Sequence, residues 1–282
     1  MLIGETKNKF SILSCENFIE VKDNDRLLEF IDISKKLGIK LLGIENYERK
    51  KIDKFIQEKI KDSREKVKAI SSIFPQIQKC ETDDDRIKCA VKEIRNSQNT
   101  TFLFSRKTLR GESIVNLKNE LNKYRKKFEV ISVVSNNLEV AKWATHDRRV
   151  DYLTIDISNK KAVDEGLISL AKQHNLTFEL CLDHLFQSND TKQLSSTIRS
   201  AKKITNLIAK KNKFILTVRP KTPYHLRTSQ QLRYLGELIG IPFNKSKNAV
   251  FNEQLTILIS NLTRQSEKYV FDGIEIVGEK ND

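Results

Sequence analysis

Short apolar runs of strand length alternate with stretches of helical periodicity along most of the chain. This alternation is typical of parallel βα units. Eight runs predict strands: FIEVK from Phe18, KLLGIE from Lys40, TTFLFS from Thr100, FEVISVVS from Phe128, DYLTIDI from Asp151, TFELCL from Thr177, KFILTVR from Lys213 and FDGIEIV from Phe271. The first run fits least well, because its charged residues suit a buried central strand poorly.

Apolar residues at helical spacing predict the connecting helices. The first helix covers 25–37 and ends before Gly38, where a glycine cap belongs. A longer helix over 48–72 ends before Pro75, and another begins at Asp84 or Asp85. This pair forms an insertion between the second and third strands. Later helices are predicted at about 113–126, 137–147, 160–173, 195–210, 228–239 and 252–266.

Eight strands alternating with helices over 282 residues predict an α/β fold, a distorted TIM-like (βα)8 barrel with a helical insertion between the second and third strands. The alternative is an open doubly wound sheet. Its nucleotide-binding versions lose support, because the first crossovers contain neither GxGxxG nor GxxxxGK[ST]. We see no repeat or low-complexity linker, so we expect a single domain over 1–282, with 48–99 as a helical elaboration.

Cysteine usage and hydropathy indicate where the protein works. Its four cysteines show no CxxC pair and no regular spacing, so neither a zinc ribbon nor a disulfide framework is indicated. The N-terminus lacks the apolar core of a signal peptide, and no apolar stretch approaches the length of a membrane span. We therefore expect a soluble, cytoplasmic protein without a membrane partner.

Basic residues outnumber acidic ones by 51 to 37, and the formal net charge is +14. The excess is concentrated in the 46 residues between Asp190 and Glu237, which contain eleven cations and no carboxylate. A charge run is usually the solvated face of a helix, but such faces usually mix both signs. A stretch without local ion pairing favours phosphates as the counter-charge, and therefore nucleic acid as the partner.

Cations also gather where two predicted strands end, the side of a barrel at which ligands bind. One group follows the third strand and another the seventh, and the guanidinium forks in them suit bidentate contact with phosphate. Tyr224 lies within the second group and could stack on an unpaired base. Together with three lysines of the basic stretch, the two groups form the predicted RNA-binding set: Arg106, Lys107, Arg110, Lys210, Lys211, Lys213, Arg219, Lys221 and Arg227.

Residues suited to catalysis or metal binding are few. The four histidines are scattered, and none forms an HxH or HExxH pair, so we expect no metal site. Cys181 is followed by Asp183 and His184, an arrangement that could supply a nucleophile and its base, but free cysteine is more often a buried structural residue. Asp156 could act as a base, yet no second carboxylate is evident beside it. We predict no catalytic residue.

The segment KYRKKFEVISVVSNNLEVAKWATHDRRVDYLTIDI from Lys123 resembles the middle of archaeal ribonuclease P protein component 3, the counterpart of the eukaryotic thirty-kilodalton subunit. A basic YRKK leads into a strand, a helix ends in WA, and DRRVD opens the next strand. The pattern continues through AVDEGLISLAKQHNLTFEL from Ala162, RSAKKITNLIAKKNKFILTV from Arg199, RTSQQLRYLGELIGIP from Arg227 and FDGIEIV from Phe271. The resemblance covers roughly 17–277 and is weak over 48–99.

The resemblance implies a role that composition and spacing do not show. It implies a barrel related to metal-dependent phosphoesterases, without their complete metal site, in a protein subunit of ribonuclease P. In that ribonucleoprotein the RNA removes the 5′ leader from precursor tRNA. The implied partners are ribonuclease P RNA, protein component 2 and other subunits, with precursor tRNA as the substrate of the assembly. Mg²⁺ would be held mainly by RNA phosphates, so no protein-bound cofactor is expected.

Two other functions stay open. A metal-dependent phosphoesterase of the related barrel class would bind metal and hydrolyse small phosphoesters, although the chain has no histidine before His146. A general RNA-binding factor, such as an RNA chaperone or a ribosome-associated protein, would carry the same charge. Binding to matched RNAs at several salt concentrations would separate specific from generic attraction.

Overall fold

The computed structural model describes residues 13–59, 66–159, 161–187, 190–266, 269–271 and 274–275. Eight strands form one sheet in which every pairing is parallel. They are β1 (Ser14–Ile19), β2 (Ile39–Glu45), β3 (Lys66–Ala69), β4 (Thr100–Arg110), β5 (Val130–Val134), β6 (Tyr152–Asp156), β7 (Thr177–Cys181) and β8 (Phe214–Thr217).

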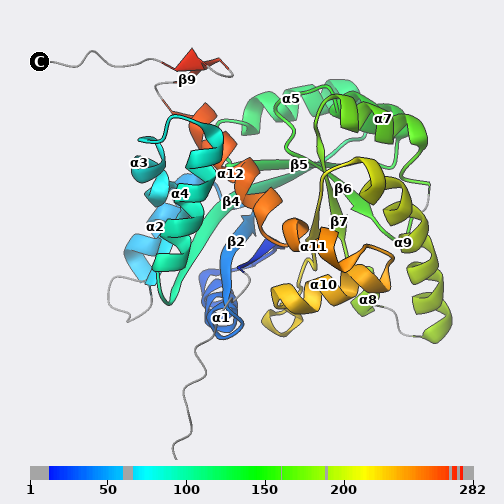
Figure 1. The fold of residues 1–282 in the computed structure, drawn as a ribbon, viewed down its shortest axis with the longest axis horizontal. Helices are drawn as coiled ribbons and strands as arrows, with labels where there is room; N and C mark the ends of the chain where they lie inside the picture. Colours follow the sequence, from blue (N-terminus) through cyan, green and yellow to red (C-terminus); the bar gives the residue numbers. More distant parts are fainter. Residues whose placement is uncertain are drawn as a thin grey trace, which may run out of the picture.

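The strand order is β1-β2-β4-β5-β6-β7-β8, with β3 beside β4, and the sheet curls into a nearly closed barrel (Figure 1). This order confirms the predicted TIM-like barrel. A doubly wound sheet would instead reverse its strand order at a switch point.

Helices surround the barrel (Figure 1). They are α1 (Asn24–Lys36), α2 (Arg49–Lys59), α3 (Phe74–Ile77), α4 (Asp83–Asn96), α5 (Ile114–Tyr124), α6 (Leu138–Ala144), α7 (Glu165–Gln173), α8 (His184–Gln187), α9 (Thr191–Lys211), α10 (Ser229–Leu238), α11 (Phe243–Ala249) and α12 (Asn252–Arg264), with 3-10 turns η1 (Ile70–Ile73) and η2 (Pro223–His225). Several begin at caps that the sequence supplies, including Asp23, Ser113 and Asp164, whose side chains accept first-turn N–H groups. In the described part of the chain, none combines the length and apolar character needed to cross a bilayer.

Two predicted elements near the N-terminus are corrected by the structure. The first strand spans Ser14–Ile19 and does not begin at Phe18, because polar residues inside the barrel break its apolar pattern. The helix expected over 48–72 is also wrong in its second half, since α2 ends at Lys59 and β3 occupies Lys66–Ala69. The elaboration over 48–99 therefore contains a barrel strand as well as helices. The single domain over 1–282 stays a prediction.

The strand predicted from Phe271 is corrected as well. Its described part belongs to β9 (Tyr269–Phe271) and β10 (Ile274–Glu275), which pair antiparallel with each other and not with the barrel. The rest of that run lies outside the described residues. The eighth strand of the sheet is consequently β3.

The length of β4 changes the placement of the first basic group. Residues Phe102 and Leu103 pair with both β2 and β3, so those two strands lie on opposite edges of β4. Further along, β4 pairs with β5 from Arg106 to Arg110. The cations that were predicted to follow this strand therefore lie within it.

Apolar side chains of α12 fill the N-terminal end of the barrel. They form one cluster with residues of the strands: Leu255, Leu258, Leu262, Leu41, Phe102, Tyr152 and Ile215. Asn261 also donates its Nδ2–H to the carbonyl of Glu129 just before β5, at 2.9 Å. The N-terminal end of the barrel is therefore mainly apolar, and the Arg106 cluster described below lies nearer the C-terminal ends of the strands.

A carboxylate joins β1 to β8, between which the described residues show no backbone pairing. Glu16 accepts hydrogen bonds from the hydroxyl of Thr217 and, at 3.2 Å, from the N–H of Val218. Burial raises the pKa of Glu16 to about 7, although these hydrogen bonds oppose the rise. The seam of the barrel therefore depends on a titratable side chain.

Candidate nucleic-acid interface

The structure distributes the nine predicted RNA-binding cations over three places. Three follow or end α9 at the N-terminal end of the strands: Lys210, Lys211 and Lys213. Five lie at the C-terminal end: Lys107, Arg110, Arg219, Lys221 and Arg227. The ninth, Arg106, lies inside the barrel. The predicted set is therefore two separate basic surfaces and one interior residue.

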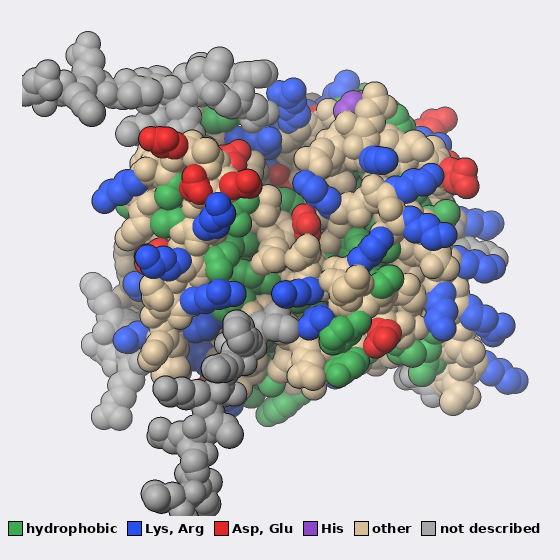
Figure 2. All heavy atoms as spheres, in the orientation of Figure 1, with side chains coloured by type: hydrophobic (Ala, Val, Ile, Leu, Met, Phe, Trp, Pro, Cys, Tyr) green, Lys and Arg blue, Asp and Glu red, His purple; other side chains and the backbone are tan. Residues whose placement is uncertain are grey.

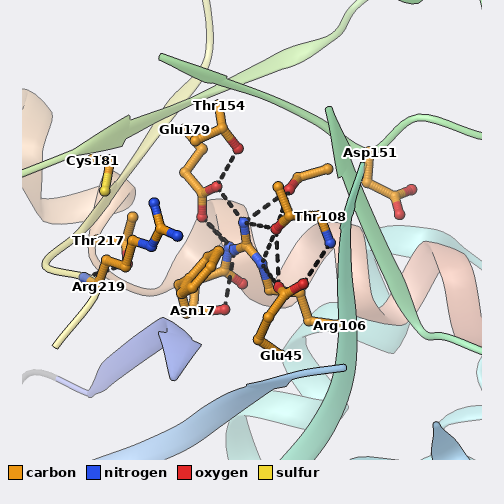
Figure 3. Close-up of polar contacts among 12 residues, drawn as sticks. Asn17, Glu45, Arg106, Thr108, Asp151, Thr154, Glu179, Cys181, Thr217 and Arg219 are labelled. Atoms are coloured by element: carbon orange, nitrogen blue, oxygen red, sulfur yellow. Dashed lines mark hydrogen bonds and ion pairs between the residues drawn. The ribbon is translucent and has the colours of Figure 1, made fainter. Parts of the chain in front are cut away.

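Arg106 corrects the prediction, because its side chain is 0% exposed and cannot reach a phosphate. Its Nη1 and Nη2 donate to the two carboxylate oxygens of Glu179, each at 2.5 Å, and its Nε lies 3.2 Å from Oε2 of Glu45 (Figure 3). The Asn17 carbonyl and the Ser132 hydroxyl accept further bonds, at 3.1 and 2.9 Å. The side chain therefore joins its own strand, β4, to four others: β1, β2, β5 and β7.

Electrostatics holds this interior pair ionised. Burial alone would lower the pKa of the Arg106 guanidinium, but the charge and hydrogen bonds of Glu179 outweigh it and raise that pKa. Burial would likewise raise the pKa of Glu179, and Arg106 reverses the shift and lowers it. Leaving one member of such a pair unpaired costs about 3–5 kcal/mol. Arg106 therefore stabilises the barrel and does not contact nucleic acid.

Sequence reasoning missed the acidic members of this cluster. Glu179 lies in the middle of TFELCL and Glu45 ends KLLGIE, both in otherwise apolar strands. A lone acid in a buried run signals an interior partner, since charges are rarely buried unpaired. That signal does not identify which cation pairs with the buried acid.

Arg219 is fixed before any ligand arrives. Its φ is +49°, a left-handed conformation that costs a residue with a side chain about 1–3 kcal/mol. Its N–H lies 3.3 Å from the Thr217 hydroxyl, and its guanidinium lies 4.5 Å from the centre of the Phe18 ring. Arg106 lies 4.4 Å from the same ring. The exposed cation is thus connected through Phe18 to the buried pair.

The loop after β8 presents an aromatic residue as well as cations. Tyr224 is 80% exposed, and Lys221 is also exposed. Arg227 is partly buried: its Nη1 donates to the carbonyls of Tyr224 and Leu226, both at 2.9 Å, and its guanidinium lies 4.7 Å from the Phe186 ring centre. Arg227 therefore shapes this loop, whereas Tyr224 and Lys221 are free to meet a partner.

The outer face of α9 carries cations and no carboxylate. Six cations on it are exposed: Lys192, Arg199, Lys202, Lys203, Lys210 and Lys211. Its opposite face packs Ala201, Ile204 and Ile208 into the core. Figure 2 shows Lys and Arg side chains projecting along the edge that α9 occupies in Figure 1. None of the ion pairs among the described residues involves these six cations, of which only Lys210 and Lys211 were in the predicted set.

A hollow of about 590 Å³ lies where the strands end, and we call it the barrel mouth. Three of the predicted RNA-binding cations line it: Lys107, Arg110 and Arg219. Lys107 is partly buried and donates to Oδ1 of Asn46 at 2.6 Å. Carboxylates line the mouth as well, among them Asp156 and Asp183. The barrel mouth therefore mixes both signs of charge, unlike α9.

The structure also shows the surroundings of the residues that the sequence offered as catalytic or metal-binding candidates. Cys181 is buried, as expected, and burial, with the nearby Asp183 charge, raises the pKa of its thiol, which disfavours the nucleophilic thiolate. Asp156 pairs with His184 at 3.2 Å. His146 and His174 were scattered in sequence, yet their ring centres lie 4.1 Å apart. Among the residues that the structure describes, no three His, Cys, Asp or Glu side chains are placed to hold a metal ion.

Comparison with known sequences identifies one family. The family model described as RNase P subunit p30 matches residues 19–266. A curated relative, Ribonuclease P protein component 3 from Methanothermobacter thermautotrophicus, is 25% identical over 169 residues. That match covers 58% of this chain and 66% of the relative, just under two thirds of its length.

Comparison with solved structures gives the same fold. A chain in a structure described as the cryo-EM structure of archaeal Ribonuclease P with mature tRNA matches with a TM-score of 0.63. The match covers 96% of this chain and 100% of the other, at 16% identity. At that identity the likeness shows a shared fold alone.

Proposed function

The chain belongs to the RNase P subunit p30 family, and we propose that it serves as a protein subunit of the ribonuclease P ribonucleoprotein. In this role it binds the catalytic RNA and supports removal of the 5′ leader from precursor tRNA. The family match confirms the resemblance that the sequence pattern indicated. Protein component 2 and other subunits are the proposed protein partners, and the cytoplasm is the proposed location.

The observation that carries this proposal is the cationic face of α9. A helix of 21 residues is about 30 Å long, so its six exposed cations can follow a phosphate backbone over that distance. Without carboxylate partners, these cations attract RNA by releasing its condensed counterions. Lys213, Lys221 and Arg219 extend the positive charge to both ends of the barrel.

In the proposed mechanism the protein shapes the RNA and takes no part in bond cleavage. Lysine and arginine side chains reduce the repulsion between RNA segments that fold against each other, and so lower the Mg²⁺ concentration that folding requires. Mg²⁺ prefers to keep several waters and to bind phosphate oxygens. The proposal therefore assigns Mg²⁺ to the RNA and no cofactor to this chain.

The test is cleavage of precursor tRNA by reconstituted ribonuclease P RNA at limiting Mg²⁺, with the other protein subunits present and this chain added or omitted. We expect faster cleavage when the chain is added, and a smaller difference at high Mg²⁺. Equal rates with and without the chain at every Mg²⁺ concentration would contradict the subunit role. Phosphoester hydrolysis by the protein alone, dependent on added metal, would favour the phosphoesterase alternative.

A further inference from the structure

The barrel mouth has the size of a small-ligand site. Its volume of about 590 Å³ lies within the range of roughly 300–1,000 Å³ that such sites occupy. Thr108 and Thr154 line it and contact the buried pair below, since the Thr154 hydroxyl donates to Glu179 at 2.6 Å. The mouth therefore rests on a rigid polar layer. It can admit one nucleotide, whereas a nucleic-acid duplex is far too wide.

Two cations of the mouth are available to a ligand. Arg110 and Arg219 are exposed, and no ion pair within the described ranges involves either side chain. Arg219 is held over the Phe18 ring, so little ordering is needed when a ligand binds. Guanidinium groups in such positions can bind a phosphate through paired hydrogen bonds.

The carboxylates of the barrel mouth argue against a site for a purely anionic ligand. Asp156, Asp183 and Glu112 line the same cavity and would repel a continuous phosphate backbone. Asp156 is held in place, because its Oδ1 accepts from the N–H and hydroxyl of Ser158 at 2.8 and 2.7 Å and its Oδ2 lies 3.2 Å from Nε2 of His184. Carboxylates of this kind accept hydrogen bonds from ribose hydroxyls and from base amino groups. The lining matches a ligand that carries both a phosphate and hydrogen-bond donors.

We propose that the barrel mouth binds a single ribonucleotide, with its phosphate on Arg110 and Arg219 and its hydroxyl or amino donors on the rim carboxylates. The ribonucleotide is either an unpaired residue of an RNA or a free nucleotide, and the chemistry of recognition is the same. If the ligand is a residue of RNA, this proposal rests on the proposed function. It then gives the basic surface at the C-terminal ends of the strands a specific task. The α9 face would then hold the backbone while the mouth captures one nucleotide.

Calorimetric titration of the full chain with adenosine 5′-monophosphate, adenosine and inorganic phosphate tests the site. We expect the monophosphate to bind more tightly than either fragment. Replacing Arg110→Gln together with Arg219→Gln should weaken monophosphate binding roughly tenfold or more, because two charge-assisted hydrogen-bond donors are removed. Asp156→Asn should weaken binding of the monophosphate and adenosine but not of phosphate. The control is Lys88→Gln with Lys92→Gln on α4, which should bind like the wild type.

Three results would overturn the proposal: no saturable binding of the monophosphate, equal affinity for phosphate alone, or equal affinity in the arginine and control variants. Competition then identifies the source of the nucleotide. If the monophosphate displaces a bound hairpin RNA that has an unpaired 3′ overhang, but does not displace a blunt hairpin, the site binds an unpaired residue of RNA. Displacement of neither hairpin would assign it to a free nucleotide.

The two proposals can fail separately. A chain that stimulates precursor-tRNA cleavage but does not bind the monophosphate keeps the subunit role and loses the nucleotide site. A chain that binds the monophosphate but leaves cleavage unchanged keeps the nucleotide site and loses the subunit role.

Discussion

A guanidinium inside a barrel needs carboxylates beside it, and Arg106 has two. Its partners Glu179 and Glu45 lie 73 and 61 positions away in the chain. In the sequence, Arg106 stands next to Lys107 in a basic cluster and gives no sign of its burial. At the scale of the residue, the same side-chain type thus serves as an interior ion partner at position 106 and as an exposed cation at position 110.

Replacing Arg106→Met should lower the free energy of unfolding by about 3–5 kcal/mol, because two buried carboxylates lose their cation. Urea denaturation measures this change. The exposed Arg110→Met is the control and should change stability by less than about 0.5 kcal/mol. Adding Glu179→Gln to Arg106→Met should restore part of the stability, since one buried charge is removed. An Arg106 variant as stable as the wild type would contradict the interior role.

The helix α9 shows what an element adds to its residues. Cations spread along 21 positions in the sequence become one face, because the apolar residues between them pack against the barrel. The helix needs no internal ion pairs, since core packing stabilises it. Its surface charge is consequently free to vary without loss of the fold.

Replacing Lys202, Lys203, Lys210 and Lys211 by Ala should weaken binding to ribonuclease P RNA. The slope of log affinity against log salt should fall by roughly 0.9 for each phosphate that the helix no longer neutralises. Alanine is a good helix former, so α9 should stay intact, which circular dichroism can check. The charge-matched control replaces Lys50, Lys51, Lys88 and Lys92 on α2 and α4 by Ala. Equal weakening in both variants would show that only net charge matters.

The whole molecule is layered along the barrel axis. Apolar residues of α12 fill one end, the Arg106 cluster lies above them, and the hollow mouth opens at the other end. Glu16 joins the two strands at the seam, so its ionisation affects the entire barrel. The pH dependence of global stability should reveal this carboxyl.

Below pH about 4.5 the Glu16 carboxyl is protonated in both the folded and the unfolded chain. As pH rises to about 7, the unfolded chain loses this proton while the folded chain keeps it, because burial raises the folded pKa to about 7. Stability should therefore fall over this window by about 3 kcal/mol, at roughly 1.4 kcal/mol for each pKa unit. Carboxyls whose pKa is lowered in the folded chain, such as Glu179, change the stability only at lower pH, below the pKa of the unfolded chain.

Glu16→Gln should flatten this dependence, measured as unfolding free energy at a series of pH values. The exposed Glu20→Gln should keep the wild-type slope. Some slope should persist in the Glu16 variant, because burial also raises the pKa of Glu129. A variant with an unchanged slope would assign the dependence to other groups.

Local sequence pattern was sufficient for the class of fold, most of the strands and the basic character of the α9 region. These follow from periodicity and charge, which are properties of contiguous residues. The family could also be recognised from the sequence, because its motifs are continuous segments. Helix α9 was predicted over 195–210 and is found over Thr191–Lys211, and the cations on its outer face are exposed.

Only the tertiary structure decided which cations are accessible, that β3 completes the sheet, and that α12 fills the barrel. Each depends on contacts between distant positions. The KVKA of β3 is too short for its period to distinguish strand from helix, and its pairing with β4 settles the matter. Arg106 and Arg219 meet the same Phe18 ring although they are far apart in the chain. Burial and charge pairing are set by such encounters, which one-dimensional pattern does not encode.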